Sequence, residues 1–242
     1  MKPSASDIYD PAFVKQVFDR CSEKYIAFSY ICSAGFTERW RKQSVALLRT
    51  DANTREGVDL MAGTGEVWPH LLAAHPQIER IVAVDISSGM HRRALSRLHA
   101  MRAHQIGFIE DDVLESALEA DSADFVISTF GLKTFRPEQH HRLARLTARV
   151  LKKGGSFAYI EASDPKGWLL RPLYLLHLKV ILPAIERVFL KGAQDFAMIG
   201  TYSTNFGNAS EFGEMLREAG LEVTYRKHFF GCATSVSGIK PL

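Results

Sequence analysis

Short apolar runs alternate with amphipathic segments through the middle of the chain. Runs that are apolar on both faces are typical of the buried strands of a parallel sheet. The strand candidates are residues 58–61, 80–85, 107–110, 123–129 and 156–161. Hydrophobic spacing of three and four residues predicts the connecting helices at about residues 66–74, 88–102 and 137–151. The repeated strand and helix units predict parallel winding, with a ligand at the carboxyl ends of the strands.

The segments on either side of this alternation complete the predicted domain. Residues 8–50 have the spacing of a helical cap, which breaks near Ser33 and Gly35. Residues 209–219 predict a helix, and residues 222–227 and 234–239 predict an antiparallel hairpin at the sheet edge. We expect a single α/β domain over residues 1–242, with a Rossmann-like core at residues 55–163 and 207–242. Its sheet should have seven mostly parallel strands with helices on both faces.

Residues 164–206 break the alternation and are expected to form a helical lid over the site. The stretch from Trp168 to Pro183 is strongly apolar, but Arg171, His177, Lys179 and two prolines interrupt it. No transmembrane segment is predicted from so interrupted a stretch. Peripheral contact of the lid with a membrane stays open, by analogy with amphipathic anchors.

Composition limits the partners of the chain. Of its 242 residues 46% are hydrophobic, which is enough to bury one substantial core. The net charge of +3 is spread without a basic block, so a nucleic-acid partner is not expected. The three cysteines have no metal-ligand spacing, and their odd number without a signal peptide favours reduced thiols and a cytoplasmic location. An oligomeric state is not predicted.

The segment from Val58 to Glu66 carries the main functional signal, because an apolar strand enters a Gly-x-Gly turn ahead of a helix. Gly63 and Gly65 can adopt backbone angles closed to other residues and let a ligand approach the main chain. Asp85 follows Gly65 by 20 residues, the spacing at which a carboxylate meets ribose hydroxyls. These features fit a nicotinamide dinucleotide as well as a smaller adenosine ligand.

Two further positions favour an adenosine ligand without phosphates. A dinucleotide fold places glycine or alanine three residues after the second glycine, where helix and strand pack closely, and this chain has Trp68 there. Asp112 and Val113, after the third strand, suit an adenine amino group beside a hydrophobic wall. No lysine or arginine stands in the glycine turn to hold a phosphate.

Motifs over most of the chain resemble those of the class I S-adenosylmethionine-dependent methyltransferases, and within them the ubiquinone/menaquinone C-methyltransferase group. They are VFDRCSEKY, ERWRK, VDLMAGTGEV, AVDISSGM, EDDV, ISTFGLKTF, RVLKKGGSFAYIEASDPKG, PLYLLHLKVILP and REAGLEVTYR. The resemblance implies S-adenosylmethionine as the cofactor, with Tyr25 closing over it from the cap. It also implies the following cofactor contacts: Asp59, Ala62, Gly63, Thr64 and Gly65 at the methionine part, Asp85, Ile86 and Met90 at the ribose and ring, Asp112 and Val113 at the adenine, and Thr129 and Phe130 beneath the sulfonium.

The departures from that group fall where its members touch substrate. The group usually has acidic, amide, arginine, serine or histidine side chains at these positions. At these seven positions this chain has Ile26, Ser29, Lys133, Thr134, Leu175, Tyr202 and Val236. Candidates for deprotonating a phenol are lost with these changes. We therefore expect the substrate pocket to differ from that of the quinone enzymes.

Aromatic side chains remain around the expected pocket, although helical insertions also bury aromatic residues simply to form a core. They are Tyr25, Phe28, Tyr30, Phe130, Phe135, Tyr174, Phe196 and Tyr202. Aromatic faces stabilise cations within about 6 Å and help to exclude water. Tyr25, Tyr174 and Tyr202 are therefore candidate catalytic residues. Glu161, at the end of the fifth strand, is a candidate for binding an amine or anchoring the lid.

Two reactions stay open for such an enzyme. The first transfers the cofactor's methyl group to a small amphipathic or aromatic molecule, as in small-molecule or secondary metabolism, with proximity supplying much of the acceleration. The second cyclises the cofactor's aminobutyrate chain to azetidine-2-carboxylate and releases methylthioadenosine. A protein that only binds the cofactor is a third class and would consume none of it.

Overall fold

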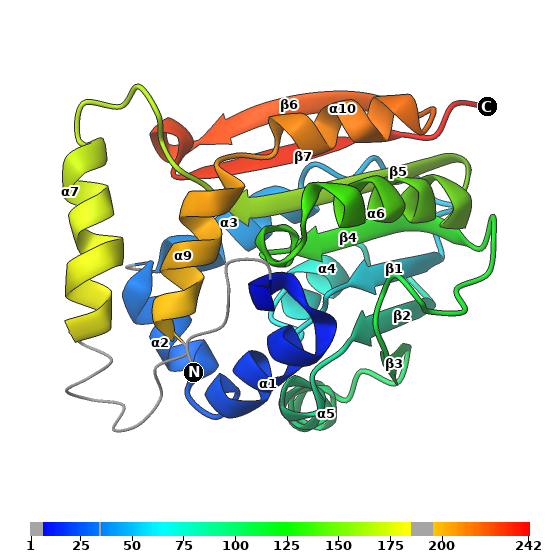
Figure 1. The fold of residues 1–242 in the computed structure, drawn as a ribbon. Helices are drawn as coiled ribbons and strands as arrows, with labels where there is room; N and C mark the ends of the chain where they lie inside the picture. The colour runs from blue at the N-terminus through cyan, green and yellow to red at the C-terminus, as the bar shows by residue number, and fades with distance from the viewer. Residues whose placement is uncertain (1–6, 34, 185–195) are drawn as a thin grey trace.

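The computed structural model describes residues 7–33, 35–184 and 196–242. Within them the chain forms one sheet (Figure 1). Its strands are β1 (Glu56–Leu60), β2 (Arg80–Asp85), β3 (Ile106–Glu110), β4 (Ala123–Thr129), β5 (Leu151–Ala162), β6 (Glu222–His228) and β7 (Ala233–Ile239). Their order across the sheet is β3-β2-β1-β4-β5-β7-β6. Strands β1 to β5 are parallel, and β7 is antiparallel to both of its neighbours.

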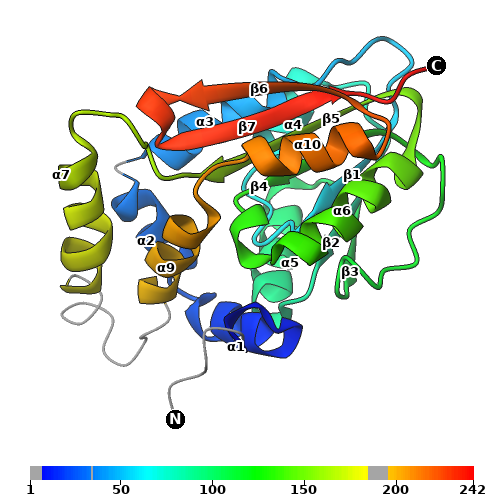
Figure 2. The ribbon, with the colours of Figure 1, turned by 45° about the horizontal axis from the view of Figure 1, so that its top comes forward.

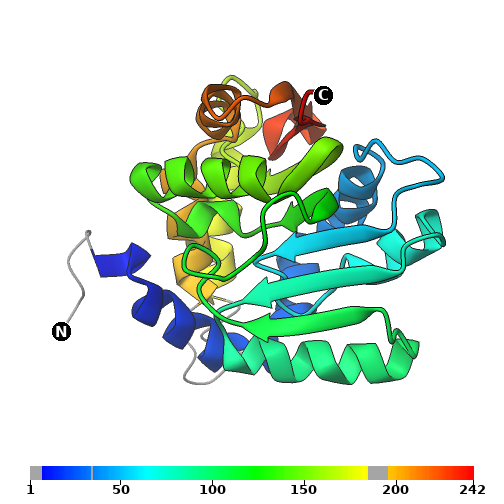
Figure 3. The same ribbon diagram turned by 90° about the vertical axis from the view of Figure 1, so that its right-hand side faces the viewer.

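Helices cover both faces of this sheet (Figure 3). One face packs against α3 (Phe36–Val45), α4 (Trp68–Ala74) and α5 (Ser88–Met101), and the other packs against α6 (Pro137–Val150) and α10 (Ser210–Glu218). Phe125 and Ile127 of β4 join the first core, whereas Val126 between them joins the second. The alternation is the two-residue period of a strand, and it explains why the predicted strands are apolar on both faces.

The N-terminal cap consists of η1 (Asp7–Tyr9), α1 (Pro11–Cys21) and α2 (Tyr25–Cys32). Asp10 caps α1 by accepting hydrogen bonds from the N–H groups of Ala12 and Phe13. Lys15 Nζ donates to the carbonyl of Ile86 at 2.7 Å and lies 2.9 Å from Glu110 Oε1. These contacts hold α1 across the carboxyl ends of β2 and β3.

The lid region begins with α7 (Arg171–Leu176) and the π-helical η3 (His177–Ile181), which continue one another. Asp164 anchors its start by accepting two hydrogen bonds from Arg171, at 2.6 and 2.7 Å. The helix α9 (Phe196–Phe206) then returns towards the body (Figure 2). Part of the expected lid, residues 185–195, lies outside the described residues. Among the helices that are described, no stretch has both the length and the apolar character needed to cross a bilayer.

The predicted seven-stranded sheet and its C-terminal antiparallel hairpin are confirmed. The helix after the glycine turn begins at Trp68, two residues later than predicted. β5 begins at Leu151 and contains the Gly154–Gly155 pair, which the sequence predicts as a turn. Its pairing with β4 shifts register there, so the two glycines form an irregularity inside the strand. Short 3₁₀ turns, η2 (Leu132–Thr134) and η4 (Phe229–Gly231), follow β4 and β6.

Candidate active site

The turn after β1 is shaped by Trp68. Gly63 and Gly65 both have positive φ, of 56° and 69°. A Cβ on Gly65 would lie 2.2 Å from the Trp68 ring, so a side chain there would collide with the indole. A Cβ on Gly63 would meet nothing within 4 Å, and Gly63 borders an open cleft. Trp68 therefore fills the space beneath the turn, where a dinucleotide fold would bring strand and helix together.

Asp59 is buried beneath this turn and does not line the cleft. Its Oδ2 accepts a hydrogen bond from Trp68 Nε1 at 2.8 Å, and its Oδ1 has no partner among the described residues. Burial raises the pKa of Asp59 to about 8, although the hydrogen bond from Trp68 opposes the rise. Asp59 thus supports the turn from inside and keeps its proton at neutral pH.

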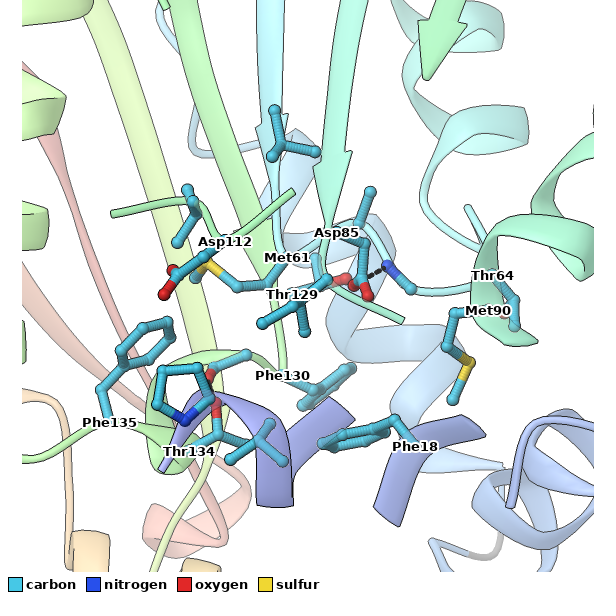
Figure 4. Close-up of a pocket in the computed structure, with 18 of the residues that line it drawn as sticks. Phe18, Met61, Thr64, Asp85, Met90, Asp112, Thr129, Phe130, Thr134 and Phe135 are labelled. Atoms are coloured by element: carbon cyan, nitrogen blue, oxygen red, sulfur yellow. Dashed lines mark hydrogen bonds between the residues drawn. The ribbon is translucent and has the colours of Figure 1, made fainter. Parts of the chain in front are cut away.

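Two other strand-end carboxyl groups face the cleft. Asp85 accepts the N–H group of Gly63 at 2.8 Å, which is the dashed line at Asp85 in Figure 4. It also accepts the N–H group of Ser87 at 2.9 Å. Burial raises the pKa of Asp85, and these two N–H groups oppose the rise. Asp112 accepts the N–H of Leu114 at 2.9 Å, and burial raises its pKa as well. A carboxylate has about four acceptor sites, so both residues retain capacity for hydroxyl or amino groups of a ligand.

We call the cavity between the cap and the strand ends the cofactor cleft. In Figure 4, Phe18 of α1 and Phe130 after β4 lie on the same side of the strand ends, across from Asp85. The cleft is lined by Tyr9, Pro11, Val14, Phe18, Tyr25, Arg41, Met61, Ala62, Gly63, Thr64, Glu66, Val84, Asp85, Ile86, Met90, Asp112, Val113, Thr129, Phe130, Gly131, Thr134, Phe135 and Gln139. It is therefore mainly apolar, with polar groups at a few fixed points.

A buried ion pair also borders the cofactor cleft. Arg41 Nη2 lies 2.5 Å from Glu66 Oε2, and the Arg41 side chain is only 5% exposed. Its guanidinium carbon lies 5.3 Å from the centroid of the Phe130 ring. Arg41 Nε and Thr64 Oγ1 are buried without a hydrogen-bond partner in the described part of the chain. Unpaired donors beside a cleft suit a charged ligand group such as an amino-acid carboxylate.

A second cavity, which we call the acceptor cavity, shares Tyr25 and Phe130 with the cofactor cleft. Its other lining residues are Ser29, Ser33, Phe36, Thr37, Trp40, Lys133, Ala162, Trp168, Leu170, Leu173, Tyr174, His177, Leu178, Leu182, Ser203, Phe229 and Cys232. Most are apolar or aromatic, and no carboxylate is among them. Burial raises the pKa of both Tyr25 and Tyr174, so the two phenols stay neutral at neutral pH.

Lys133 is held at the edge of the acceptor cavity by a buried carboxylate. Its Nζ lies 2.8 Å from Glu161 Oε1 and donates to the carbonyl of Phe130 at 2.6 Å. The backbone N–H of Lys133 also donates to Glu161, at 3.1 Å. Glu161 is fully buried and therefore fixes the turn after β4, which carries Phe130.

The structure brings most of the predicted cofactor residues together. Asp59 lies beneath the turn and Gly65 is part of it, and neither residue lines the cleft. The residues that do line it are Tyr25, Ala62, Gly63, Thr64, Asp85, Ile86, Met90, Asp112, Val113, Thr129 and Phe130.

The four candidate catalytic residues separate into two pairs. Tyr25 and Tyr174 line the acceptor cavity. Tyr202 lines neither cavity, because it is fully buried and its hydroxyl donates to the carbonyl of Ile8. Glu161 lines neither cavity, because its carboxylate is engaged by Lys133. Neither side chain faces a cavity in this geometry, and the catalytic roles of both stay predictions.

The remaining predicted aromatic residues do not form one pocket. Phe135 lines the cofactor cleft and not the acceptor cavity. Tyr30 is 60% exposed and lies outside both. The side chains of Phe28 and Phe196 lie outside the described residues.

Sequence reasoning missed several residues of the cleft. Arg41 lies within the ERWRK motif, but its pairing with Glu66 has no local signal because it joins two separate helical regions. Val14 and Phe18 are four residues apart on α1 and share a face of that helix. That spacing indicated a buried face, but it could not show that a ligand site lies against it.

The cofactor cleft lies at the carboxyl ends of β1 and β4, where the strand order reverses, as expected for a doubly wound sheet. The last strand is antiparallel, and the cleft has one carboxyl group placed to accept ribose hydroxyls and another placed to accept an adenine amino group. Together these features define the Rossmann-like S-adenosylmethionine-dependent methyltransferases. The sequence profile of the ubiE/COQ5 methyltransferase family matches residues 5–240. The chain belongs to this family, and it is an enzyme that uses S-adenosylmethionine as its cofactor.

The similar proteins and structures described next are named as methyltransferases. Demethylmenaquinone methyltransferases of Bacillus cereus (strain B4264) and Bacillus anthracis (strain A0248) are each 28% identical over 229 residues, covering 94% of this chain and 95% of the relative. An O-methyltransferase family protein from Burkholderia thailandensis has a TM-score of 0.63 at 19% identity, with 86% of this chain and 57% of that chain covered. Human N-acetylserotonin methyltransferase in complex with S-adenosylmethionine has a TM-score of 0.59 at 18% identity, covering 90% and 58%. The two structures show the fold.

The cyclising alternative gains no support from these comparisons, because the relatives named are methyltransferases. It also relied on Tyr202 beside Tyr174, and the structure buries Tyr202 away from both cavities.

Proposed function

We propose that the enzyme transfers the methyl group of S-adenosylmethionine to a small, mainly apolar, aromatic or amphipathic acceptor in the acceptor cavity. The proposal rests on one observation, that Tyr25 and Phe130 line both cavities. A methyl group at this junction would have the cofactor on one side and the acceptor on the other. Methyl transfer needs such an in-line approach, and proximity supplies much of its acceleration.

The cofactor contacts are proposed from the acceptors and donors of the cofactor cleft. Asp85 would accept the ribose hydroxyls and Asp112 the adenine amino group, each with its spare lone pairs. Arg41 and Thr64 would bind the amino-acid carboxylate through their unpaired buried atoms. The bound cofactor supplies a methyl group on a positively charged sulfur, and the Phe130 ring face would stabilise that charge by about 0.5–2 kcal/mol.

The lining of the acceptor cavity supports a substrate that differs from that of the quinone enzymes. Of the positions that depart from that group, Ser29 and Lys133 line this cavity, whereas Ile26, Leu175 and others do not. None of the described residues that line the cavity has a carboxylate, which disfavours a cationic amine as acceptor. The ammonium of Lys133 has three N–H groups, two of which are accounted for within the described residues. The third would orient an oxygen of the acceptor.

A labelled methyl group tests this proposal. The purified protein is incubated with methyl-deuterated S-adenosylmethionine and a hydroxylated bicyclic aromatic acceptor, and products are identified by mass spectrometry. We expect one molecule of S-adenosylhomocysteine for each labelled acceptor molecule. Phe130→Ala should lower kcat/KM by roughly 10- to 30-fold, the equivalent of losing a cation–ring contact of about 1.4–2 kcal/mol. Tyr225→Phe, on the strand β6, is the control and should leave the rate unchanged.

Three results would contradict the proposal. Preferential labelling of a small cationic amine would remove the assigned acceptor class. An unchanged rate in Phe130→Ala would remove the junction as the place of transfer. Methylthioadenosine in place of S-adenosylhomocysteine would exclude methyl transfer itself.

A further inference from the structure

Phe130 has a strained backbone conformation at the end of β4. Its φ is 68°, in the left-handed region that bulky side chains rarely adopt. Its side chain lines both the cofactor cleft and the acceptor cavity, and in Figure 4 it lies on the same side of the strand ends as Phe18 of α1. A strained residue persists only where its surroundings hold it, and such residues gather at functional sites. The contacts that hold Phe130 are therefore of interest for function.

Both backbone polar groups of Phe130 are hydrogen-bonded to a small cluster of residues. Its N–H donates to the carbonyl of Ile160 at 2.8 Å, and its carbonyl accepts Lys133 Nζ at 2.6 Å. Glu161, the residue after Ile160, lies 2.8 Å from Lys133 Nζ and also accepts the backbone N–H of Lys133 at 3.1 Å. The side chains of Lys133 and Glu161 are only 4% and 0% exposed, so water does not compete for these bonds. We call Lys133 and Glu161 the η2 clamp.

Other contacts fix the turn beyond Phe130. His140 Nε2 lies 2.8 Å from the carbonyl of Leu132, and both groups are buried. A Cβ on Gly131 would lie 2.5 Å from Met61 Cβ, so the turn also packs closely against the residue that follows β1. These contacts leave the turn little room to shift as a whole. The η2 clamp differs from them because it bonds to Phe130 itself.

Two cationic side chains lie near the Phe130 ring. The guanidinium carbon of Arg41 is 5.3 Å from the ring centroid, and Lys133 Nζ is 5.8 Å from it. Each cation is paired with a carboxylate, Arg41 with Glu66 and Lys133 with Glu161. The pairing offsets the positive charge beside the ring. A further cation, such as a sulfonium, can therefore approach the ring with little repulsion.

Methyl transfer changes the charge of the sulfur at this position. S-adenosylmethionine has a positively charged sulfur, whereas the product S-adenosylhomocysteine has a neutral thioether. The face of an aromatic ring attracts a cation and has no comparable attraction for a neutral sulfur. A ring held at the junction of the two cavities would therefore bind the cofactor more tightly than the product.

We propose that Glu161 is a positioning residue that holds the Phe130 ring against the sulfonium through Lys133, so that the cleft prefers the charged cofactor to its neutral product. This inference rests on the proposed function, because it takes the sulfonium to lie at Phe130. Glu161 lines neither cavity and acts only through the residues it bonds to. Without the clamp, Phe130 would relax towards an ordinary backbone conformation and its ring would leave the junction.

Calorimetry on the full chain without acceptor tests this role. The quantity measured is the cofactor preference, the Kd of S-adenosylhomocysteine divided by the Kd of S-adenosylmethionine. Phe130→Ala should lower the preference by about tenfold, through loss of a cation–ring contact. Lys133→Met combined with Glu161→Gln, the clamp variant, leaves no unpaired charge and should lower it by about the same factor. The affinity of the clamp variant for S-adenosylhomocysteine should change by less than about twofold.

Two further variants separate position from charge and from folding. Lys133→Arg retains a charged donor for Phe130 and Glu161, so it should keep the preference of the unmodified chain. Glu161→Asp retains the charge but withdraws the carboxylate from Lys133, so it should lower the preference. This single substitution also tests the proposal if thermal unfolding shows that the clamp variant does not fold. Added to Phe130→Ala, the clamp substitutions should lower the preference no further, because both act on one ring.

The matched control is Tyr159→Phe. It removes a buried hydrogen bond of 2.6 Å to Thr147 from the same strand, two residues before Glu161, and Tyr159 lines neither cavity. We expect this variant to lose stability and to keep the cofactor preference. A loss of preference as large as in the clamp variant would show that the preference follows stability, and it would overturn the role of Glu161.

The inference and the proposed function fail in different measurements. An unchanged preference in the clamp variant, beside a lowered one in Phe130→Ala, overturns the positioning role and leaves the ring contact in place. Equal weakening of both ligands in the clamp variant also overturns it, because the clamp would then only support the fold. An unchanged preference in Phe130→Ala overturns the inference together with the sulfonium contact. The expected preferences without any labelled acceptor would support the positioning role and remove the assigned acceptor class.

Discussion

Asp59 illustrates how burial, rather than residue type, sets the role of a carboxyl group in this site. Asp59 and Asp85 both lie at the ends of neighbouring strands. Asp85 faces the cofactor cleft and accepts two backbone N–H groups, whereas Asp59 lies beneath the turn against Trp68. Desolvation is the main cause of the raised pKa at both positions. The two carboxyl groups differ in what opposes the rise, which is one side-chain hydrogen bond at Asp59 and two backbone N–H groups at Asp85.

We expect the stability of the cofactor-free protein to fall as the pH rises towards 8. Asp59 is protonated in the folded state up to a pH of about 8, whereas its carboxyl group in the unfolded chain ionises near pH 4. The folded state therefore binds more protons between these values, and the free energy of unfolding decreases with pH until it levels off above the folded pKa. Asp59→Asn retains an acceptor for Trp68 and cannot ionise, so its Tm should fall less.

Thermal unfolding of both proteins from about pH 5 to pH 8 measures this difference. Asp124→Asn is the control, because the pKa of Asp124 is lowered and its titration lies below this range. The Asp124→Asn variant should show the same change of Tm with pH as the unmodified chain, with a lower Tm throughout. Identical slopes for the Asp59→Asn variant and the unmodified chain would rule out the buried protonated carboxyl group.

At the scale of elements, the two glycines of the turn between β1 and α4 have different roles. Gly65 has to lack a side chain because the Trp68 ring occupies that space. Gly63 has free space around it and donates its N–H to Asp85. Gly65 therefore serves the packing of the turn, and Gly63 serves the shape of the cofactor cleft.

Alanine substitutions should separate these two requirements. Both replace a glycine with positive φ, which costs about 1–2 kcal/mol. Gly65→Ala also pushes the Trp68 indole away from Asp59 and should lose roughly a further 1–3 kcal/mol of stability. Gly63→Ala adds a methyl group at the cofactor cleft and should bind S-adenosylhomocysteine about tenfold or more weakly while it stays folded. Calorimetry and thermal unfolding measure the two effects. Equal losses of stability would contradict the role given to Trp68.

At the scale of the molecule, the cofactor cleft lies between the cap and the sheet and is lined by residues of both. The cap contributes Val14, Phe18 and Tyr25 to the cleft, and Lys15 ties α1 to the ends of β2 and β3. The lid region reaches the same cap through Tyr202 and Ile8. A ligand in the cleft would contact the cap and the sheet at once, so its binding energy should stabilise their contact.

Hydrogen exchange should report this coupling. We expect S-adenosylhomocysteine to slow amide exchange in residues 11–32, because a bound ligand makes local opening of the cap more costly. Residues 222–239 of the hairpin lie away from the cleft and should exchange at an unchanged rate. Asp85→Ala should remove the protection through loss of ligand affinity. Equal protection of cap and hairpin would indicate a global effect and contradict the coupling.

Much of the fold could be predicted because its signals are local. The apolar runs at β2 and β4 have the bounds that the structure shows, since a strand buried on both faces must be apolar throughout. The glycine turn and the acceptor at Asp85 could be found for a similar reason, because backbone freedom and strand-end position depend on neighbours in sequence. The bulge at Gly154 was missed, since a glycine pair has the same local signature in a turn and in a strand.

The sequence alone determined the order of strands and helices along the chain, the class of cofactor and about half of the residues that line its cleft. The tertiary structure decided which side chains face each cavity. Tyr202 bonds to a carbonyl 194 residues away, and Glu161 pairs with Lys133 across two strand ends. Such contacts depend on how distant elements pack, and a side chain's type and spacing do not specify its partner. The pairing of Arg41 with Glu66 and the joining of the lid to η4 were decided in the same way, by packing between elements.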